Sequence, residues 1–170
     1  DIRINARYKT ESLKLPIYYS IRIGTSKNNH GWEMEMIHVK MYLQNNPPEI
    51  EQFNISHGYN ILQLNRNWIW DEFLFRAGAG IVIAHPENIV RRMKFDDKSF
   101  LDKGYYFSGP CFQVSGEKRI RIYGKLYFSM EVKTTASITK IGVYNGHAIV
   151  THIGLHGLFG LGYSLNLDNQ

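Results

Sequence analysis

The feature that most constrains the fold is a period-two alternation over residues 152–167, which read HIGLHGLFGLGYSLNL. One set of residues is mostly large and apolar: Ile153, Leu155, Phe159, Leu161, Tyr163, Leu165 and Leu167. The intervening set is small or polar: His152, Gly154, His156, Gly160, Gly162, Ser164 and Asn166. Successive side chains of a strand point to opposite faces, so the pattern predicts a long β-strand with one apolar face.

Similar alternating segments follow one another along the chain, separated by clusters of turn-forming residues. We expect strands at residues 2–8, 17–24, 32–43, 53–64, 73–84, 105–115, 119–134 and 152–167. The expected turns read SKNNHG, NRNWIWDE, GEKR and YNGH, and the Asn-Gly pair of the last suits a type I′ hairpin. A count of eight to ten antiparallel strands predicts an all-β fold, either a sandwich or, as we favour, a closed up-and-down β-barrel of about eight strands.

In the segment 32–43 the apolar residues change faces between Met36 and Ile37, which predicts a bulge or a change of environment along the strand. The whole chain, 1–170, is expected to be one domain. Its single cysteine, Cys111, excludes an intrachain disulfide and a cysteine-rich zinc site.

The net charge of +5 suits nucleic acid or the phosphates of a membrane surface. The sequence shows no nucleic-acid-binding motif, so we expect no nucleic-acid partner. We also expect no cofactor. The chain opens with Asp1 rather than Met, and we expect a signal peptide or another leading segment to have been removed.

Three observations favour lipid over a protein core as the environment of the apolar faces. At least five segments reach the ~9–11 residues of a tilted transmembrane strand. Glycine pairs at 78 and 80 and at 160 and 162 suit a narrow interior filled by neighbouring side chains. Aromatic residues lie near expected strand ends, as in an interfacial girdle: Trp32, Trp68, Trp70, Tyr105 and Tyr106. A soluble, lipocalin-like barrel that binds an apolar ligand remains the alternative.

The stretches RAGAGIVIA and GLFGLGYSLNL resemble the strands of small outer-membrane β-barrels of Gram-negative bacteria. The resemblance implies a transmembrane barrel in the outer membrane, reached through the periplasm after signal-peptide removal. It also implies lipid or lipopolysaccharide as the partner. The superfamily includes adhesion and stability barrels and lipid A-modifying enzymes. We expect a structural or lipid-interacting component with a polar-filled interior.

The alternative within this class is an enzyme that modifies lipid A. Its candidate catalytic residues are Ser56, His156 and Glu131, with the carboxylate orienting a histidine for general-base chemistry. The His-Ser strand motif of the lipid A deacylases is not reproduced here, so their roles are not carried over. His152 and His156 lie ~13 Å apart along a strand, so we expect no metal site.

Two sets of residues are candidates for binding. Arg91, Arg92 and Lys94 lie in a long loop and suit lipopolysaccharide phosphates, and His85 and Glu87 begin that loop. The second set is Lys133 and His152, on the polar faces of their strands. We expect Lys133 and Glu131 to form ion pairs with each other or with Arg76, Arg121 or a histidine.

Overall fold

The chain forms a single antiparallel β-sheet in the computed structural model, which describes residues 2–15, 17–95 and 104–165, apart from the side chains of Ser56 and His57. Within these residues the strands are β1 (Tyr8–Lys9), β2 (Tyr19–Lys27), β3 (His30–Leu43), β4 (Ile50–Trp70), β5 (Phe73–Ala84), β6 (Glu87–Val90), β7 (Met93–Lys94), β8 (Tyr106–Tyr123), β9 (Leu126–Val143) and β10 (Gly146–Tyr163). None of the described residues forms a helix long and apolar enough to cross a bilayer.

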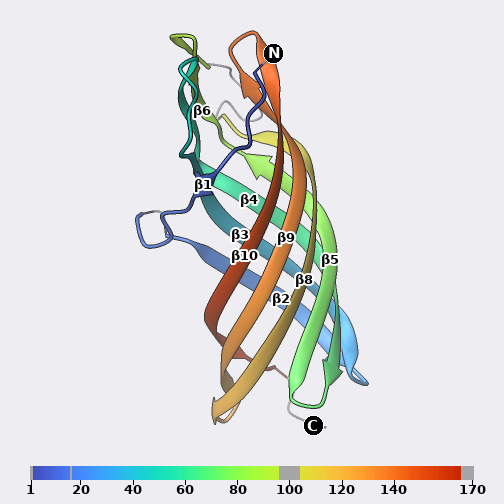
Figure 1. Cartoon of the computed structure of the whole chain (residues 1–170). Coiled ribbons are helices and arrows are strands. Elements are labelled where there is room, and N and C mark those ends of the chain that lie inside the picture. Colours follow the sequence, from blue (N-terminus) through green and yellow to red (C-terminus); the bar gives the residue numbers. More distant parts are fainter. Residues whose placement is uncertain (1, 16, 96–103, 166–170) are drawn as a thin grey trace.

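The sheet is an up-and-down meander that curls around its long axis (Figure 1). Its order is β1-β3-β4-β5-β8-β9-β10, and β2 pairs with the same strand as β1, along the other half of β3. The short strands β6 and β7 extend one end of the sheet, where β6 pairs with the first residues of β4. The predicted all-β, antiparallel, up-and-down architecture is confirmed.

The predicted closure of the barrel is wrong. Among the described residues, β2 pairs only with β3 and β10 pairs only with β9, so no ladder joins β2 to β10. The path from β2 to β10 contains seven long strands, and the odd number makes its first and last strands run in the same direction. Closing this gap, which we call the seam, would require a parallel ladder in an otherwise antiparallel sheet.

Side chains bring the two edges of the seam together. The Tyr18 hydroxyl, one residue before β2, lies 3.2 Å from Nδ1 of His156 on β10, and the two rings stack with centroids 5.8 Å apart. Tyr8 meets His152 edge-on at 6.4 Å. The segment 2–8, expected to be a first, weak strand, contributes only the first residue of β1.

Several predicted boundaries are confirmed. The segment 73–84 is β5, and the YNGH hairpin turns at Asn145 with a φ of 51°. Two predicted turns are wrong, because the polar residues of NRNWIWDE and GEKR continue β4 and β8 as far as Trp70 and Tyr123. There Asn65, Asn67 and Glu117 are buried on the inner face of the sheet.

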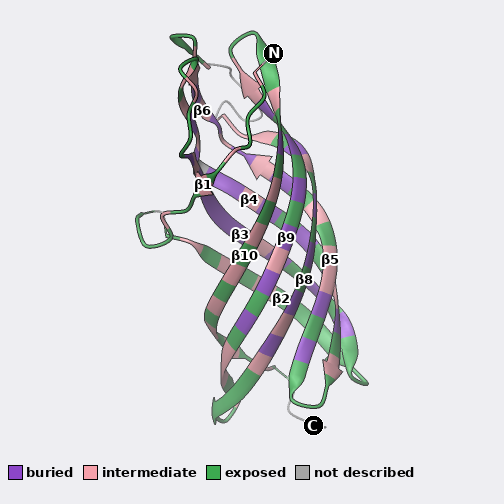
Figure 2. Ribbon diagram, viewed as in Figure 1, coloured by how far each residue is buried: buried purple, intermediate pink, exposed green. Residues whose placement is uncertain are grey.

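Buried and exposed residues alternate along the long strands (Figure 2). The interior has two parts. At one end it is apolar, with a core of Ile37, Val39, Met41, Leu43, Phe53, Ile55, Tyr59, Ile61, Val82, Ala84, Cys111, Ile141 and Val150. Toward the other end the inner face carries charged and amide side chains instead.

The change of faces predicted in β3 is a change of environment, since the pairing with β4 is regular from His30 to Val39. Glu33, Glu35 and Ile37 all point inward and are buried, and the inner face passes from charged to apolar between the last two. The bulge in this pair of strands lies further on, between Val39 and Met41.

Candidate functional site: an ion-pair network inside the sheet

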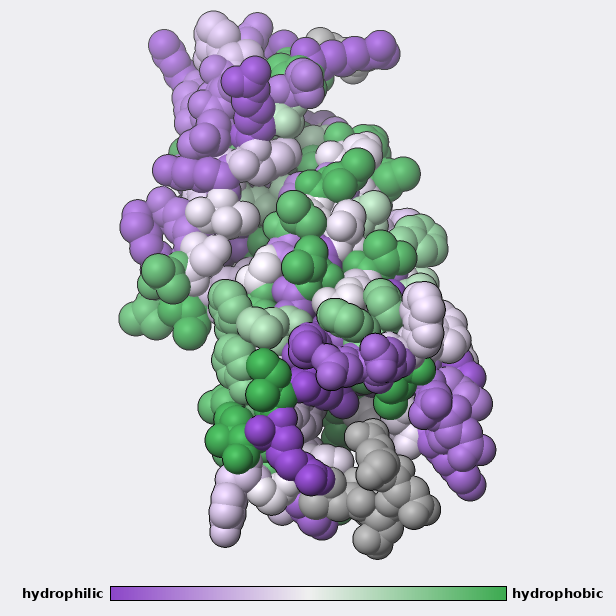
Figure 3. Space-filling model, turned by 60° about the horizontal axis from the view of Figure 1, so that its bottom comes forward, coloured by the Kyte–Doolittle hydropathy of each residue, from purple (hydrophilic) through white to green (hydrophobic). Residues whose placement is uncertain are grey.

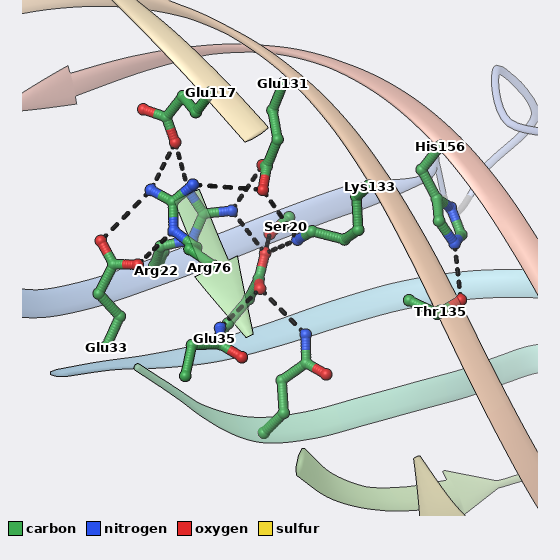
Figure 4. Close-up of polar contacts among 12 residues, drawn as sticks. Ser20, Arg22, Glu33, Glu35, Arg76, Glu117, Glu131, Lys133, Thr135 and His156 are labelled. Atoms are coloured by element: carbon green, nitrogen blue, oxygen red, sulfur yellow. Dashed lines mark hydrogen bonds and ion pairs between the residues drawn. The ribbon is translucent and has the colours of Figure 1, made fainter. Parts of the chain in front are cut away.

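The inner face holds four carboxylates and four cations in contact with one another, and Figure 4 shows all of them except Arg119. They are Arg22 on β2, Glu33 and Glu35 on β3, Arg76 on β5, Glu117 and Arg119 on β8, and Glu131 and Lys133 on β9. The pairs on β3, β8 and β9 are two residues apart, which places both members on the inner face. The network therefore draws on five strands and carries no net formal charge.

Two guanidinium groups join strands that are not neighbours in the sheet. Arg22 donates from Nη1 to Glu117 at 2.8 Å, and from Nη2 to Glu35 at 2.8 Å and to Glu131 at 2.6 Å. Arg76, fully buried, contacts Glu33 through Nε, Glu117 through Nη2 and Glu131 through Nη1. The edge strand β2 is thereby tied across the interior to β3, β8 and β9.

Glu35 is the most heavily hydrogen-bonded acid of the network. Its Oε1 accepts hydrogen bonds from Arg22, from the Lys133 amino group and from the Ser20 hydroxyl at 2.7 Å. Its Oε2 accepts from the side-chain amides of Gln63 and Asn65, each at 3.0 Å. Each carboxylate oxygen thus has at least two donors, which is what a buried carboxylate requires.

The ion pairs expected for Glu131 and Lys133 are present. Their charged atoms lie 3.6 Å apart, and Glu131 also contacts Arg76 at 3.3 Å. Arg121, the other arginine considered, is exposed. The sequence-based prediction of these ion pairs did not include Arg22, Glu33, Glu35, Glu117 and Arg119. The signal was in the sequence: WEMEM places two acids on the face opposite Trp32, Met34 and Met36.

A second polar cluster lies beside the network, at the seam. His156 is hydrogen-bonded through Nε2 to the Thr135 hydroxyl at 2.9 Å and through Nδ1 to Tyr18. His152 packs edge-on against Tyr59, with ring centroids 5.9 Å apart. Its buried Nδ1 has no hydrogen-bond partner.

The two histidine rings converge on the glycine between them. A Cβ built on Gly154 would lie 2.8 Å from His156 Nε2 and 3.0 Å from His152 Cε1. The rings therefore approach far more closely than the ~13 Å strand spacing alone implies. No group of three or more metal-ligating His, Cys, Asp or Glu side chains forms in the described part of the chain.

The three candidate catalytic residues are not joined by any contact that the structure describes. Glu131 is engaged by Arg22, Arg76 and Lys133, whereas His156 bonds Thr135 and Tyr18. Ser56 lies in β4, beside the bulge, and its side chain is outside the description.

The candidate binding residues fall into two groups far apart in the fold. Lys133 belongs to the network and His152 to the seam cluster. The remaining five lie beyond the apolar end of the interior. Arg91 and Arg92 form the exposed turn between β6 and β7, followed by Lys94 on β7, while Glu87 begins β6 and His85 packs its ring against Tyr105.

No protein-family model, curated protein or solved structure matches this chain.

Proposed function

We propose that this chain is a small membrane-embedded β-barrel protein of the outer-membrane type, acting as a structural or lipid-interacting component with a filled interior. The observation that carries the proposal is the placement of charge. Four carboxylates and four cations lie inside one half of the sheet, while many large apolar side chains are exposed on its outer face. A water-soluble sheet protein has the opposite arrangement.

The outer face of β9 has the dimensions of a membrane span. Its outward residues before the exposed Lys140 are Leu126, Phe128, Met130, Val132, Thr134, Ala136 and Ile138. Thr134 is the one polar residue of this run. Twelve steps of ~3.3 Å give roughly 40 Å along the strand. At the ~45° tilt typical of membrane strands this covers roughly 28 Å, close to the ~30 Å hydrocarbon core.

The outer face of β10 is apolar over a similar length. Ile153, Leu155, Phe159 and Leu161 are each 73–77% exposed. In Figure 3 hydrophobic side chains are spread over the middle of the face in view among neutral ones, and hydrophilic side chains gather at the top and again at the lower centre and right. Exposed apolar surface of this extent is unusual for a soluble monomer and is typical of surfaces that contact lipid or protein.

Exposed aromatic residues near one end of this surface support the same proposal. Trp68 and Trp70 end β4, Trp32 lies on the neighbouring strand, and Phe73 follows the turn. Arg66 stacks over Trp32 at 5.2 Å. Amphipathic rings beside a cation are favoured at headgroup level.

The interior contents favour a structural role over the two alternatives. A soluble carrier of apolar ligands needs an apolar cavity, whereas here the apolar end is filled by the core and the other end by ion pairs. A hydrolase that uses Glu131 and His156 needs a hydrogen bond between them, and each bonds other residues instead.

A lipid-embedded sheet must also satisfy the backbone groups at its edges, because unpaired groups in hydrocarbon are costly. The contact between Tyr18 and His156 places the edges of the seam within side-chain reach. In a bilayer we expect β2 and β10 to pair directly, in the parallel orientation that their directions impose.

The test is extraction and refolding. We expect the expressed chain to resist extraction from membranes by alkaline carbonate and to become monodisperse only in detergent. Refolding from urea should succeed in detergent micelles or vesicles and fail in plain buffer. A protein that is monodisperse and folded in plain buffer would contradict the proposal.

A further inference from the structure

We infer that the loop between β1 and β2 is an interfacial anchor that inserts Leu13 and Leu15 into the phosphate-bearing headgroup layer of the membrane. This inference rests on the proposed function, because it assigns a second contact to the same bilayer. We call residues 10–15 and 17–18 the β1–β2 loop. In Figure 1 it projects sideways from the sheet, between the two ends of the molecule.

The loop is folded by its own hydrogen bonds. The amide of Lys14 donates to the Glu11 carbonyl at 3.1 Å, and the amide of Tyr18 donates to the Ser12 carbonyl at 2.9 Å. The amino group of Lys40 on β3 donates to the Lys14 carbonyl at 2.8 Å, which fastens the loop to the sheet. Its outward side chains are therefore displayed by a defined turn.

The apolar side chains of this turn face away from the protein. Leu13 is 93% exposed, Leu15 88% and Ile17 48%. Leu13 and Leu15 contribute nothing to the core in this position, yet the turn that presents them is anchored. Exposed leucines on a fixed turn are suited to burial against another surface.

The position of the loop along β3 indicates which surface the two leucines contact. On the outer face of β3, Met34 and Met36 continue the apolar surface, and the next outward residues are the polar His38 and Lys40. Both of these are only 5% exposed, although they point outward. The β1–β2 loop and Tyr19, which stacks on His38 at 5.2 Å, lie over them. The loop thus sits where the apolar outer face of β3 gives way to polar side chains, and we assign this level to the headgroups.

The charge of the N-terminal segment is complementary to lipid phosphates. The described residues 2–15 contain four cations and one acid: Arg3, Arg7, Lys9 and Lys14 against Glu11. Glu11 pairs with Lys14 at 3.0 Å and with Lys9 at 3.5 Å, so the segment keeps a positive excess. Basic residues beside exposed leucines favour an anionic lipid surface.

The test is the depth of fluorescent labels in vesicles of phosphatidylcholine and phosphatidylglycerol. Three single substitutions supply the labelling cysteine: Leu15→Cys in the loop, Phe159→Cys on β10 and Tyr144→Cys in the β9–β10 turn. Native Cys111 is fully buried and stays unlabelled in the folded protein. Spin-labelled lipids carry the quencher either at the headgroup or in the middle of the acyl chain.

We expect the label at position 15 to lose more fluorescence with the headgroup quencher than with the mid-chain quencher. The label at 159 should show the reverse, and the label at 144 should lose little with either. If position 15 is unquenched, or is quenched chiefly from mid-chain, while 159 behaves as expected, the anchor is refuted and the proposed function survives. If 159 is unquenched, both are refuted.

A charge reversal tests the electrostatic part. Lys14→Glu, with the label at position 15, should reduce headgroup quenching in vesicles containing phosphatidylglycerol. It should have little effect in phosphatidylcholine alone. The matched control is Lys140→Glu, at an exposed lysine on β9. An equal loss in both lipids, or the same loss from the control, would contradict attraction between the loop and anionic headgroups.

Discussion

Arg76 is the residue whose environment departs most from what its chemistry prefers. Its side chain is fully buried and lies among Glu33, Glu117 and Glu131. A buried guanidinium is tolerated only when its charge and its donors are matched. The three carboxylates in turn depend on it, so the charge balance of the interior depends on single side chains.

Replacing this arginine should therefore be costly. Arg76→Met removes a cation that contacts three buried carboxylates and leaves the interior with an uncompensated negative charge, so we expect the free energy of unfolding to fall by ~3–5 kcal/mol. Urea unfolding in detergent micelles, followed by tryptophan fluorescence, measures the change. Arg121→Met, at an exposed position of β8, is the control and should change it by less than ~0.5 kcal/mol. Equal effects of the two substitutions would show that the network adds no stability.

Two glycines of β10 differ in their surroundings, because Gly154 lies on the inner face of the sheet and Gly157 on the outer face. A Cβ on Gly154 would crowd His156, His152 and Thr135, whereas a Cβ on Gly157 would meet nothing within 4 Å. We expect Gly154→Ala to destabilise the fold by ~1–3 kcal/mol through overpacking. It should also shift the imidazole resonances of both histidines in NMR spectra.

The control Gly157→Ala has the same change in composition and should leave those resonances in place. Matching shifts from the two variants would mean that the histidine rings do not converge on Gly154.

At the scale of the strand, period-two alternation predicted which residues share a face, and the structure confirms it for β5 and β10. Strand ends were harder to predict. Asn65 and Asn67 are of a type that favours turns, and Glu117 lies in the polar stretch GEKR, so all three were assigned to turns. Here they are buried on the inner face, in the half of the interior that holds the ion-pair network. Apart from Arg119, which is two residues from Glu117, the partners of their side chains lie on other strands and are distant in sequence, so no local pattern reveals them.

The outer face of β10 allows a test at this scale. Leu155→Arg places a charge in the middle of the apolar surface, and in vesicles we expect it to lower the free energy of unfolding by ~2–4 kcal/mol. Tyr144→Arg, in the turn before β10, should be nearly neutral. If Leu155→Arg leaves the free energy of unfolding in vesicles unchanged, this face lies in water.

At the scale of the molecule, the sequence predicted the meander but not whether its two edge strands pair with each other. The closed barrel was expected from about eight strands. The sheet has seven long strands among the described residues. Residues 2–8 add almost nothing to it, because β1 has only two residues and the β1–β2 loop separates β1 from β2. Closure depends on strand parity and on contacts between opposite ends of the chain, such as Tyr18 with His156, and neither appears in a local pattern.

The seam should be the first part of the sheet to open. We expect backbone amides of β10 that face the seam to exchange with deuterium faster than those bonded to β9, in detergent micelles as measured by NMR. In vesicles, where β2 and β10 are expected to pair, the difference should shrink. Equal protection in micelles would indicate that the edges are already hydrogen-bonded there.

The span of Arg22 across the interior has a consequence for biogenesis. Its partners on β8 and β9 are made about a hundred residues after it, as its bonds to Glu117 and Glu131 have sequence separations of 95 and 109. A chain still emerging from its ribosome, or truncated before β9, holds this arginine with part of its counterions missing. The ion pairs of the N-terminal edge can form in full only after β9 has been made, so a chaperone that keeps the early strands apart would suit this topology.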